Sequence, residues 1–141
     1  MAAYDPDNIF AKILKGEIPC HKLYEDDDTL AFLDIMPRTE GHTLVVTKEK
    51  ATDLFDITPK GLGTLMAVVQ KLAPKIQKAV GADGILIQQF NGAPAGQTVF
   101  HLHVHIVPIK EGVPLKRHAG DMADQGELAT TADKIRTVLN A

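Results

Sequence analysis

Three histidines occupy every second position of the segment Phe100-His101-Leu102-His103-Val104-His105-Ile106-Val107-Pro108, and this pattern constrains the fold more than any other feature of the chain. The residues between them, Leu102, Val104 and Ile106, are all apolar. Because successive side chains of a strand point to opposite faces, we predict a strand with imidazoles on one face and aliphatic side chains on the other. Buried imidazoles lower stability unless they find polar partners, so a row of them indicates a functional site rather than simple packing.

The residues alone leave two chemistries open for this row. Histidines at alternate strand positions can hold zinc, with a third ligand and an open position for water. Alternatively, one imidazole attacks a phosphorus or acyl centre while its neighbours orient it and handle protons. The upstream loop of residues 91–99 offers the neutral polar side chains Asn91, Gln97 and Thr98. It contains no acidic or thiol ligand and therefore suits phosphate oxygens better than a metal.

With φ as an apolar residue, His101 to Val107 reads His-φ-His-φ-His-φ-φ. This is the signature of the histidine triad (HIT) nucleotide hydrolases and transferases, which the chain resembles over about residues 8–110. The likeness extends to the segments Asn8-Ile9-Phe10-Ala11-Lys12-Ile13, Gly16-Glu17-Ile18-Pro19, Ala31-Phe32-Leu33-Asp34-Ile35 and Gly41-His42-Thr43-Leu44-Val45-Val46.

The resemblance implies covalent catalysis at the α-phosphorus of a nucleotide. His103 matches the nucleophile, which forms a nucleotidyl-histidine that water then hydrolyses. His105 matches the histidine that contacts the phosphate and assists the leaving group. His101 matches the one that orients the nucleophile, and His42 a further histidine that supports the cluster. A neutral imidazole is a competent nucleophile near pH 7, and two steps replace one difficult displacement.

The resemblance also assigns substrate contacts. Asn91, Gln97 and Thr98 match residues that bind phosphate oxygens as charge develops there. Asp34 matches the acid that holds the ribose hydroxyls, although an Asp at this place also suits a turn cap. The residues that match the apolar slot for the base can equally be ordinary core residues; they are Ile9, Phe10, Ile13, Phe32 and Ile35.

The chain departs from the family at one place. Many bacterial members hold a structural zinc with two cysteines, a further histidine and a triad-region histidine. The matching positions here are Asn8, Ala11 and Lys50, none of which is a usual zinc ligand. Cys20 is the only cysteine, so a disulfide within the chain is excluded. We expect no structural zinc, no metal at the catalytic site and no required cofactor; magnesium would accompany only a polyphosphate substrate.

Residue periodicity predicts five strands, at residues 22–25, 29–33, 42–47, 85–90 and 100–109. A short helix capped by Asp7 is expected through Leu14, and a long helix from Pro59 to near Gly81, with Pro74 predicting a kink or a break. Helices combined with a mostly antiparallel sheet give an α+β fold, and the resemblance implies the HIT-like form of it. We divide the chain into a HIT domain at 1–112 and a tail at 113–141. The tail carries a C-terminal amphipathic helix marked by Leu128, Ala132, Ile135 and Leu139.

Bulk properties suit a small cytoplasmic enzyme. A chain of 141 residues fits one core, and a net charge of -3 gives no electrostatic footprint for nucleic acid. The N-terminus lacks the basic and apolar stretches of a signal peptide, and no apolar run reaches the roughly 18 residues of a membrane span. We therefore expect no nucleic acid and no membrane as a partner, and the family resemblance implies a purine nucleotide as the substrate.

Three questions stay open at this point. The substrate is a nucleoside phosphoramidate, as in Hint-like members, or a dinucleoside polyphosphate, as in Fhit-like members. The alternative to an enzyme is a nucleotide-binding regulatory or interaction protein with vestigial hydrolysis.

The resemblance implies a homodimer, and the apolar residues on more than one side of the helix at 59–80 agree with a second protomer. The terminal helix of the same protomer is the alternative cover for that helix.

Overall fold

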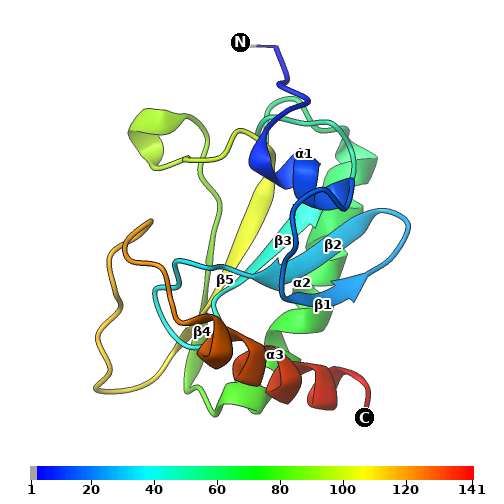
Figure 1. The fold of residues 1–141 in the computed structure, drawn as a ribbon. Helices are drawn as coiled ribbons and strands as arrows, with labels where there is room; N and C mark the ends of the chain where they lie inside the picture. Colours follow the sequence, from blue (N-terminus) through cyan, green and yellow to red (C-terminus); the bar gives the residue numbers. More distant parts are fainter. Residues whose placement is uncertain (1–2) are drawn as a thin grey trace.

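The computed structural model describes residues 3–141, which form a five-stranded sheet and three α-helices (Figure 1). The sheet order is β1-β2-β3-β5-β4, and every neighbouring pair is antiparallel. The predicted α+β fold is therefore confirmed. The strands are β1 (Lys22–Glu25), β2 (Thr29–Leu33), β3 (Thr43–Thr47), β4 (Gly84–Gln88) and β5 (His103–Ile109). The helices are α1 (Ile9–Leu14), α2 (Pro59–Val80) and α3 (Gln125–Leu139), with a short 3-10 helix η1 (Ala93–Ala95) after β4.

Two helix predictions need correction. The N-cap of α1 is Asn8 rather than Asp7, because the Asn8 side chain accepts the Ala11 N–H at 2.9 Å. Helix α2 runs without a break through Pro74. Pro74 is exposed, as is Gln70 four residues before it, so the carbonyl that lacks an N–H partner lies on the solvent side of the helix.

The strand boundaries also differ from expectation. β3 begins at Thr43 and β4 covers residues 84–88, but the important change is at β5, which begins only at His103. Leu102 N–H donates to the carbonyl of Ala51 at 2.8 Å, in the loop after β3, instead of joining a strand ladder. Two of the three triad histidines therefore lie on a strand, and His101 lies on the bend that leads into it.

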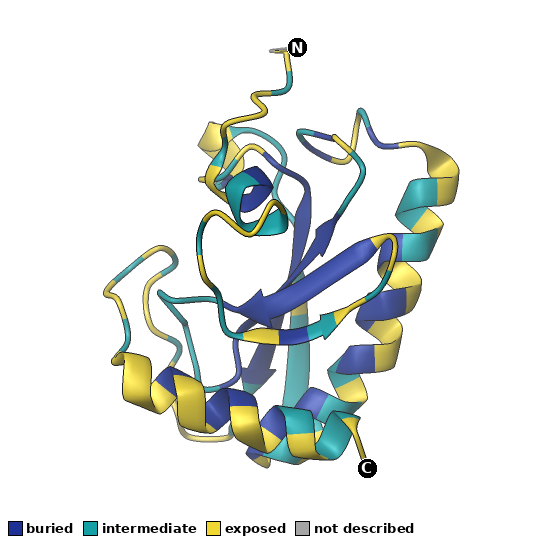
Figure 2. Cartoon of the chain, turned by 45° about the vertical axis from the view of Figure 1, so that its right-hand side comes forward, coloured by how far each residue is buried: buried dark blue, intermediate teal, exposed yellow. Residues whose placement is uncertain are grey.

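The aliphatic face of the sheet packs against α2 and α3. Leu102, Val104 and Ile106 are buried there, as predicted. The α3 residues Leu128, Ala132 and Ile135 belong to the same buried cluster, so the expected amphipathic helix is present and shares the core of the sheet. In Figure 2 both helices expose their outer sides and bury their inner ones. Burial of each such aliphatic side chain contributes about 1.5–3 kcal/mol to the stability of the folded protein.

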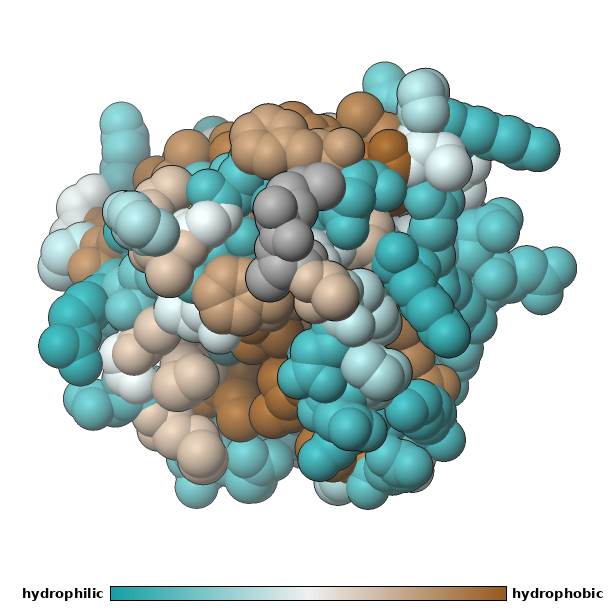
Figure 3. Space-filling view, turned by 90° about the horizontal axis from the view of Figure 1, so that it is seen from above, coloured by the Kyte–Doolittle hydropathy of each residue, from teal (hydrophilic) through white to brown (hydrophobic). Residues whose placement is uncertain are grey.

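The opposite face carries α1 and two of the imidazoles. Pairing of β3 with β5 sets Val46 beside His103 and Leu44 beside His105. A second buried cluster lies below α1 and consists of Phe10, Leu30, Phe32, Leu44 and Val46. Figure 3 looks down on the N-terminal end of the molecule and shows apolar side chains gathered there. Among the described helices, none combines the length and apolarity needed to cross a bilayer.

Candidate active site

His103 lies at the start of β5 with one ring nitrogen fixed and one free. Its Nδ1 is 2.6 Å from the carbonyl oxygen of His101. A carbonyl only accepts, so Nδ1 carries the proton and Nε2 keeps its lone pair. Burial lowers the pKa of His103 to about 4, and the ring is neutral at pH 7. The arrangement therefore presents a neutral imidazole with an unprotonated Nε2.

His105 is oriented by a chain of hydrogen bonds that begins at the backbone of Arg38. The Arg38 N–H donates to His42 Nδ1 at 3.0 Å, so the proton of neutral His42 sits on Nε2. His42 Nε2 lies 2.9 Å from His105 Nδ1 and donates to it. The proton of neutral His105 is then on Nε2, which is buried and has no hydrogen-bond partner among residues 3–141. Burial lowers the pKa of His42 to about 3 and that of His105 to about 2, so both rings are neutral at pH 7.

His101 has both ring nitrogens engaged. Its Nε2–H donates to the carbonyl of Thr47 at 2.7 Å, and its Nδ1 accepts from the hydroxyl of Tyr4 at 2.6 Å. The two rings meet edge to face, with centroids 5.5 Å apart. Sequence reasoning missed Tyr4 because the residue is 97 positions from His101 and lies in no motif. The His101 carbonyl thus holds the ring of His103, and Tyr4 and Thr47 hold the ring of His101.

The side chains present do not fit either zinc site considered from the sequence, the family's structural site or a site on the three triad histidines. The side-chain oxygen of Asn8 accepts the helix N–H of Ala11, and Ala11 is buried without any donor atom. A zinc shared by the three triad histidines would need a free nitrogen on His101, where both are occupied. Ligand atoms of Asp34, His42 and His105 do lie within 4.8 Å of one another. An ion there would have to break the hydrogen bond between the two imidazoles.

An apolar cleft of about 140 Å³ lies beside His103 and His105. The five predicted base-slot residues all line it, together with Asp34 and Thr98. Phe10 of α1 stands edge to face on His103, with ring centroids 4.8 Å apart. The cleft also includes residues that were not selected from the sequence: Ile18, Pro19, Cys20, Leu33, Met36, Leu44, Val99, His118 and Ala119. An apolar cleft lined by two imidazoles suits a nucleotide base and its phosphate.

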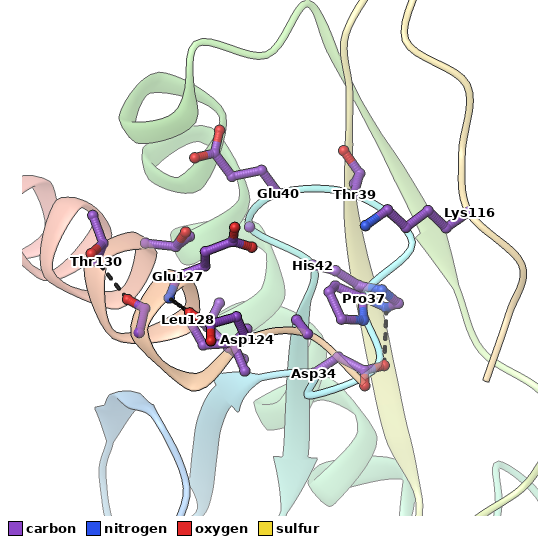
Figure 4. Close-up of a pocket in the computed structure, with 15 residues that line it drawn as sticks. Asp34, Pro37, Thr39, Glu40, His42, Lys116, Asp124, Glu127, Leu128 and Thr130 are labelled. Carbon is purple, nitrogen blue, oxygen red and sulfur yellow. Dashed lines mark hydrogen bonds and ion pairs between the residues drawn. The ribbon is translucent and has the colours of Figure 1, made fainter. Parts of the chain in front are cut away.

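Asp34 follows β2 and points toward His42. One carboxylate oxygen accepts the N–H of Met36 at 2.8 Å, and the other lies 3.6 Å from His42 Nε2. The turn contact considered from the sequence is therefore present. Burial raises the pKa of Asp34, although the Met36 hydrogen bond opposes this. Asp34 also lines a second cavity of about 490 Å³, between the loop after β2 and the start of α3 (Figure 4).

The three residues predicted to bind phosphate do not all lie in the cleft. The Asn91 side chain accepts the N–H of Leu54 and pairs with the amide of Gln89. Gln97 is buried, accepts the Gly92 N–H and donates to the carbonyls of Thr52 and Val99. Both amides therefore shape the loop from within, whereas Thr98 lines the cleft.

Residues 113–124, which we name the C-terminal strap, bring a further histidine to the cleft. The strap is tied to the loop after β2 by two bonds between Lys116 and Arg38, and by Ala123 N–H donating to Ile35. Between these ties, His118 Nε2–H donates to the carbonyl of Gly96 at 2.9 Å. The His118 ring centroid is 5.6 Å from that of His105. No local sequence signal marks His118, because only the folded strap brings it to the triad.

Comparisons with known proteins agree with this geometry. The family described as HIT domain matches residues 15–112. Adenylylsulfatase HINT3 of Arabidopsis thaliana is 42% identical over 105 residues, which span 74% of this chain and 53% of that protein, so the match covers about half the length of this relative. Adenosine 5'-monophosphoramidase hnt1 of Schizosaccharomyces pombe is 42% identical over 100 residues, spanning 71% of this chain and 72% of that protein. A crystal structure of a Hit-like protein from Bartonella henselae superposes with a TM-score of 0.90 and 46% identity, covering 96% of this chain and 99% of that one.

Proposed function

The chain belongs to the HIT domain family, and from this premise we propose that it is a nucleotide hydrolase that transfers a nucleotidyl group to water through His103. Two relatives are named as hydrolases of adenylyl compounds, one an adenylylsulfatase and one an adenosine 5'-monophosphoramidase. The proposed substrate is a purine nucleoside phosphoramidate or a dinucleoside polyphosphate. Its base would occupy the apolar cleft, and its ribose hydroxyls would bind Asp34.

The first step is attack of His103 Nε2 on the α-phosphorus. The lone pair forms the N–P bond while the bond to the leaving group breaks, and the Nδ1–H of His103 stays on the His101 carbonyl. His105 Nε2–H donates a hydrogen bond to the phosphoryl oxygens as negative charge grows on them. Thr98 lies in the same cleft and adds a second donor. Water then attacks the phosphorus and loses a proton to the solvent, the N–P bond breaks, and His103 leaves as a neutral imidazole.

One observation carries this proposal: the hydrogen bonds of the two imidazoles are complementary. A carbonyl forces the proton of His103 onto Nδ1, whereas the His42 N–H forces that of His105 onto Nε2. The site therefore pairs a nucleophile with a hydrogen-bond donor on neighbouring positions of one strand face. Ring centroids of the two residues are 5.0 Å apart. A vestigial binding protein would have no need to maintain opposite tautomers.

Steady-state hydrolysis tests the proposal. Wild type, His103→Ala and the control His21→Ala would be assayed on adenosine 5'-phosphoramidate and diadenosine polyphosphates. The His21 side chain bonds to Gln125 at the surface, so its loss is expected to leave turnover unchanged. Loss of the nucleophile is expected to lower kcat by about 10⁴-fold or more. Nucleotide binding without turnover by the wild type would instead support the regulatory alternative.

We also propose a homodimer. Helix α3 covers part of α2 within the protomer, but Met66 of α2 stays 39% exposed. Strand β4 is at the edge of the sheet, and its Ile87 is 41% exposed. An unpaired edge with an exposed aliphatic residue suits pairing with a second copy. Light scattering at low micromolar concentration would measure the mass; a monomer would contradict the proposal.

A further inference from the structure

The carbonyl of His101 fixes the tautomer of the proposed nucleophile, yet the sheet does not hold this carbonyl. The ladder between β3 and β5 ends at the pair Val46 and His103, so His101 lies outside it. The N–H of Leu102 bonds to the loop carbonyl of Ala51 instead of a strand. The His101 carbonyl nevertheless lies 2.6 Å from Nδ1 of His103 and keeps a proton there. Strand pairing therefore does not set the position of the group on which His103 depends.

The ring of His101 supplies that support, because both of its nitrogens are bound. Its Nε2–H donates at 2.7 Å to the carbonyl of Thr47, the last residue of β3. Its Nδ1 accepts from the Tyr4 hydroxyl at 2.6 Å. Burial lowers the pKa of His101, so the ring is neutral at pH 7 and Nδ1 keeps the lone pair that accepts this bond. A ring that is fixed at both ends also restricts the backbone that carries it.

Tyr4 is held in place by a compact turn that leads into α1. The Asp5 carboxylate accepts the N–H of Asp7 at 2.9 Å. The Asp5 carbonyl accepts the side-chain amide of Asn8 at 2.7 Å, and Asn8 is the N-cap of α1. The residue directly after Tyr4 is therefore bonded to the start of α1, so the phenol reaches His101 from a braced segment.

We propose, as a refinement that rests on the proposed function, that Tyr4 is a positioning residue for the nucleophile and acts through His101. Its hydroxyl holds the His101 ring, the ring holds the His101 backbone, and the carbonyl of that backbone holds the Nδ1–H of His103. Nε2 of His103 thereby keeps its lone pair for the phosphorus. Tyr4 does not line the cleft, so its contribution comes through this chain of bonds.

Tyr4 and Phe10 fix different properties of the nucleophile. Phe10 stands edge to face on His103, with ring centroids 4.8 Å apart, and this contact restricts the orientation of the ring. It does not select which nitrogen carries the proton, because an aromatic neighbour is available to both tautomers alike. The His101 carbonyl does select it, because a carbonyl only accepts. Loss of the Tyr4 hydroxyl is therefore expected to change the tautomer of His103 and kcat, and to leave substrate binding intact.

The other tyrosine of the chain provides a matched control. Tyr24 donates its hydroxyl to Asp26 at 2.6 Å and does not line the cleft. Tyr4→Phe and Tyr24→Phe each remove a bonded hydroxyl and keep the ring. Steady-state hydrolysis of adenosine 5'-phosphoramidate would compare them with the wild type. We expect Tyr4→Phe to lower kcat by about tenfold and to change KM by less than about twofold. Tyr24→Phe is expected to change neither.

A double-mutant cycle tests whether Tyr4 acts through His101. His101→Ala removes the ring and keeps the backbone carbonyl. In that background the hydroxyl has no ring to hold, so Tyr4→Phe is expected to change kcat by less than about twofold. An equal loss of kcat in both backgrounds would overturn the proposal, as would an unchanged kcat in Tyr4→Phe or an equal loss in Tyr24→Phe.

Nitrogen-15 NMR of the ligand-free protein reads the tautomer of His103 without any turnover. We expect a single Nδ1–H tautomer in the wild type and in Tyr24→Phe, and a mixture of tautomers in Tyr4→Phe. A His103 tautomer that is the same in all three proteins would overturn the proposal. A wild type that hydrolyses no nucleotide, but whose single tautomer is lost in Tyr4→Phe, would refute the proposed function and support the positioning role.

Discussion

The Nε2 of His42 lies 2.9 Å from the Nδ1 of His105, and this bond determines which nitrogen of His105 carries a proton. Because the backbone N–H of Arg38 occupies the other nitrogen of His42, only one direction of donation is available. His42 does not line the cleft with His105, yet it decides whether His105 offers the substrate a donor or a lone pair.

Replacement of His42 is therefore expected to lower kcat without loss of substrate affinity. In His42→Ala, His105 can take its proton on Nδ1 and present a lone pair to phosphate oxygens, and the loss of one such donor lowers kcat by about 10²-fold. His42→Gln keeps an N–H in reach of His105 and is expected to retain more activity. Steady-state kinetics on one nucleotide substrate would compare them. Equal losses in both variants would show that the donated hydrogen bond is not the cause.

Asp34→Asn tests the ribose assignment. The variant keeps an oxygen for the Met36 N–H, and it removes a carboxylate whose pKa is raised by burial and which therefore lowers stability at neutral pH. We expect unchanged or slightly higher thermal stability, a loss of about tenfold in kcat/KM for ribonucleotides and a smaller loss for deoxyribonucleotides. The same loss with both sugars would remove Asp34 from ribose recognition.

The buried imidazoles predict a pH dependence of stability. The pKa values of His42, His103 and His105 are lowered to about 3, 4 and 2, so below about pH 6.5 the unfolded chain binds protons that the folded chain does not. Stability is full above this range and falls as the pH is lowered, by about 2 kcal/mol at about pH 5 for one such group. Urea unfolding at pH 7.5 and 5 would measure it, and His42→Gln should show a shallower dependence. A free energy of unfolding that is equal at both pH values in the wild type would contradict this account.

Elemental analysis tests the predicted lack of structural zinc. The resemblance matches Asn8, Ala11 and Lys50 to the family's zinc-ligand positions, and the Tyr4 hydroxyl occupies Nδ1 of His101. We expect far less than one zinc per chain, and activity on a phosphoramidate that survives chelator treatment. Stoichiometric zinc together with chelator-sensitive turnover would favour a metal-dependent hydrolase.

Much of the fold was predictable because it depends on local patterns. Alternation of apolar residues placed Val104 and Ile106 in the core, and Thr58 with Pro59 marked the start of α2. The start of β5 was not predictable, since it depends on Leu102 bonding to the distant loop residue Ala51.

The same division holds for the site. The triad pattern and the family resemblance led to His103, His105 and the apolar slot, which the structure brings into one cleft. The internal role of Gln97 follows from contacts with Thr52 and Gly92 that no local pattern encodes. Tyr4 and His118 were missed for the same reason, because each reaches the triad only through tertiary contacts.

The most direct measurement of the central claim is the mass of the protein during turnover. His103 is the buried imidazole with a fixed Nδ1–H and an unprotonated Nε2, so it should carry the nucleotidyl group. Acid-free quenching and intact-mass spectrometry are expected to show one nucleotidyl group added to the wild type and none added to His103→Ala. Peptide mapping is expected to place the group on His103. Turnover with no adduct on rapidly quenched wild type, or an adduct that persists in His103→Ala, would contradict the account.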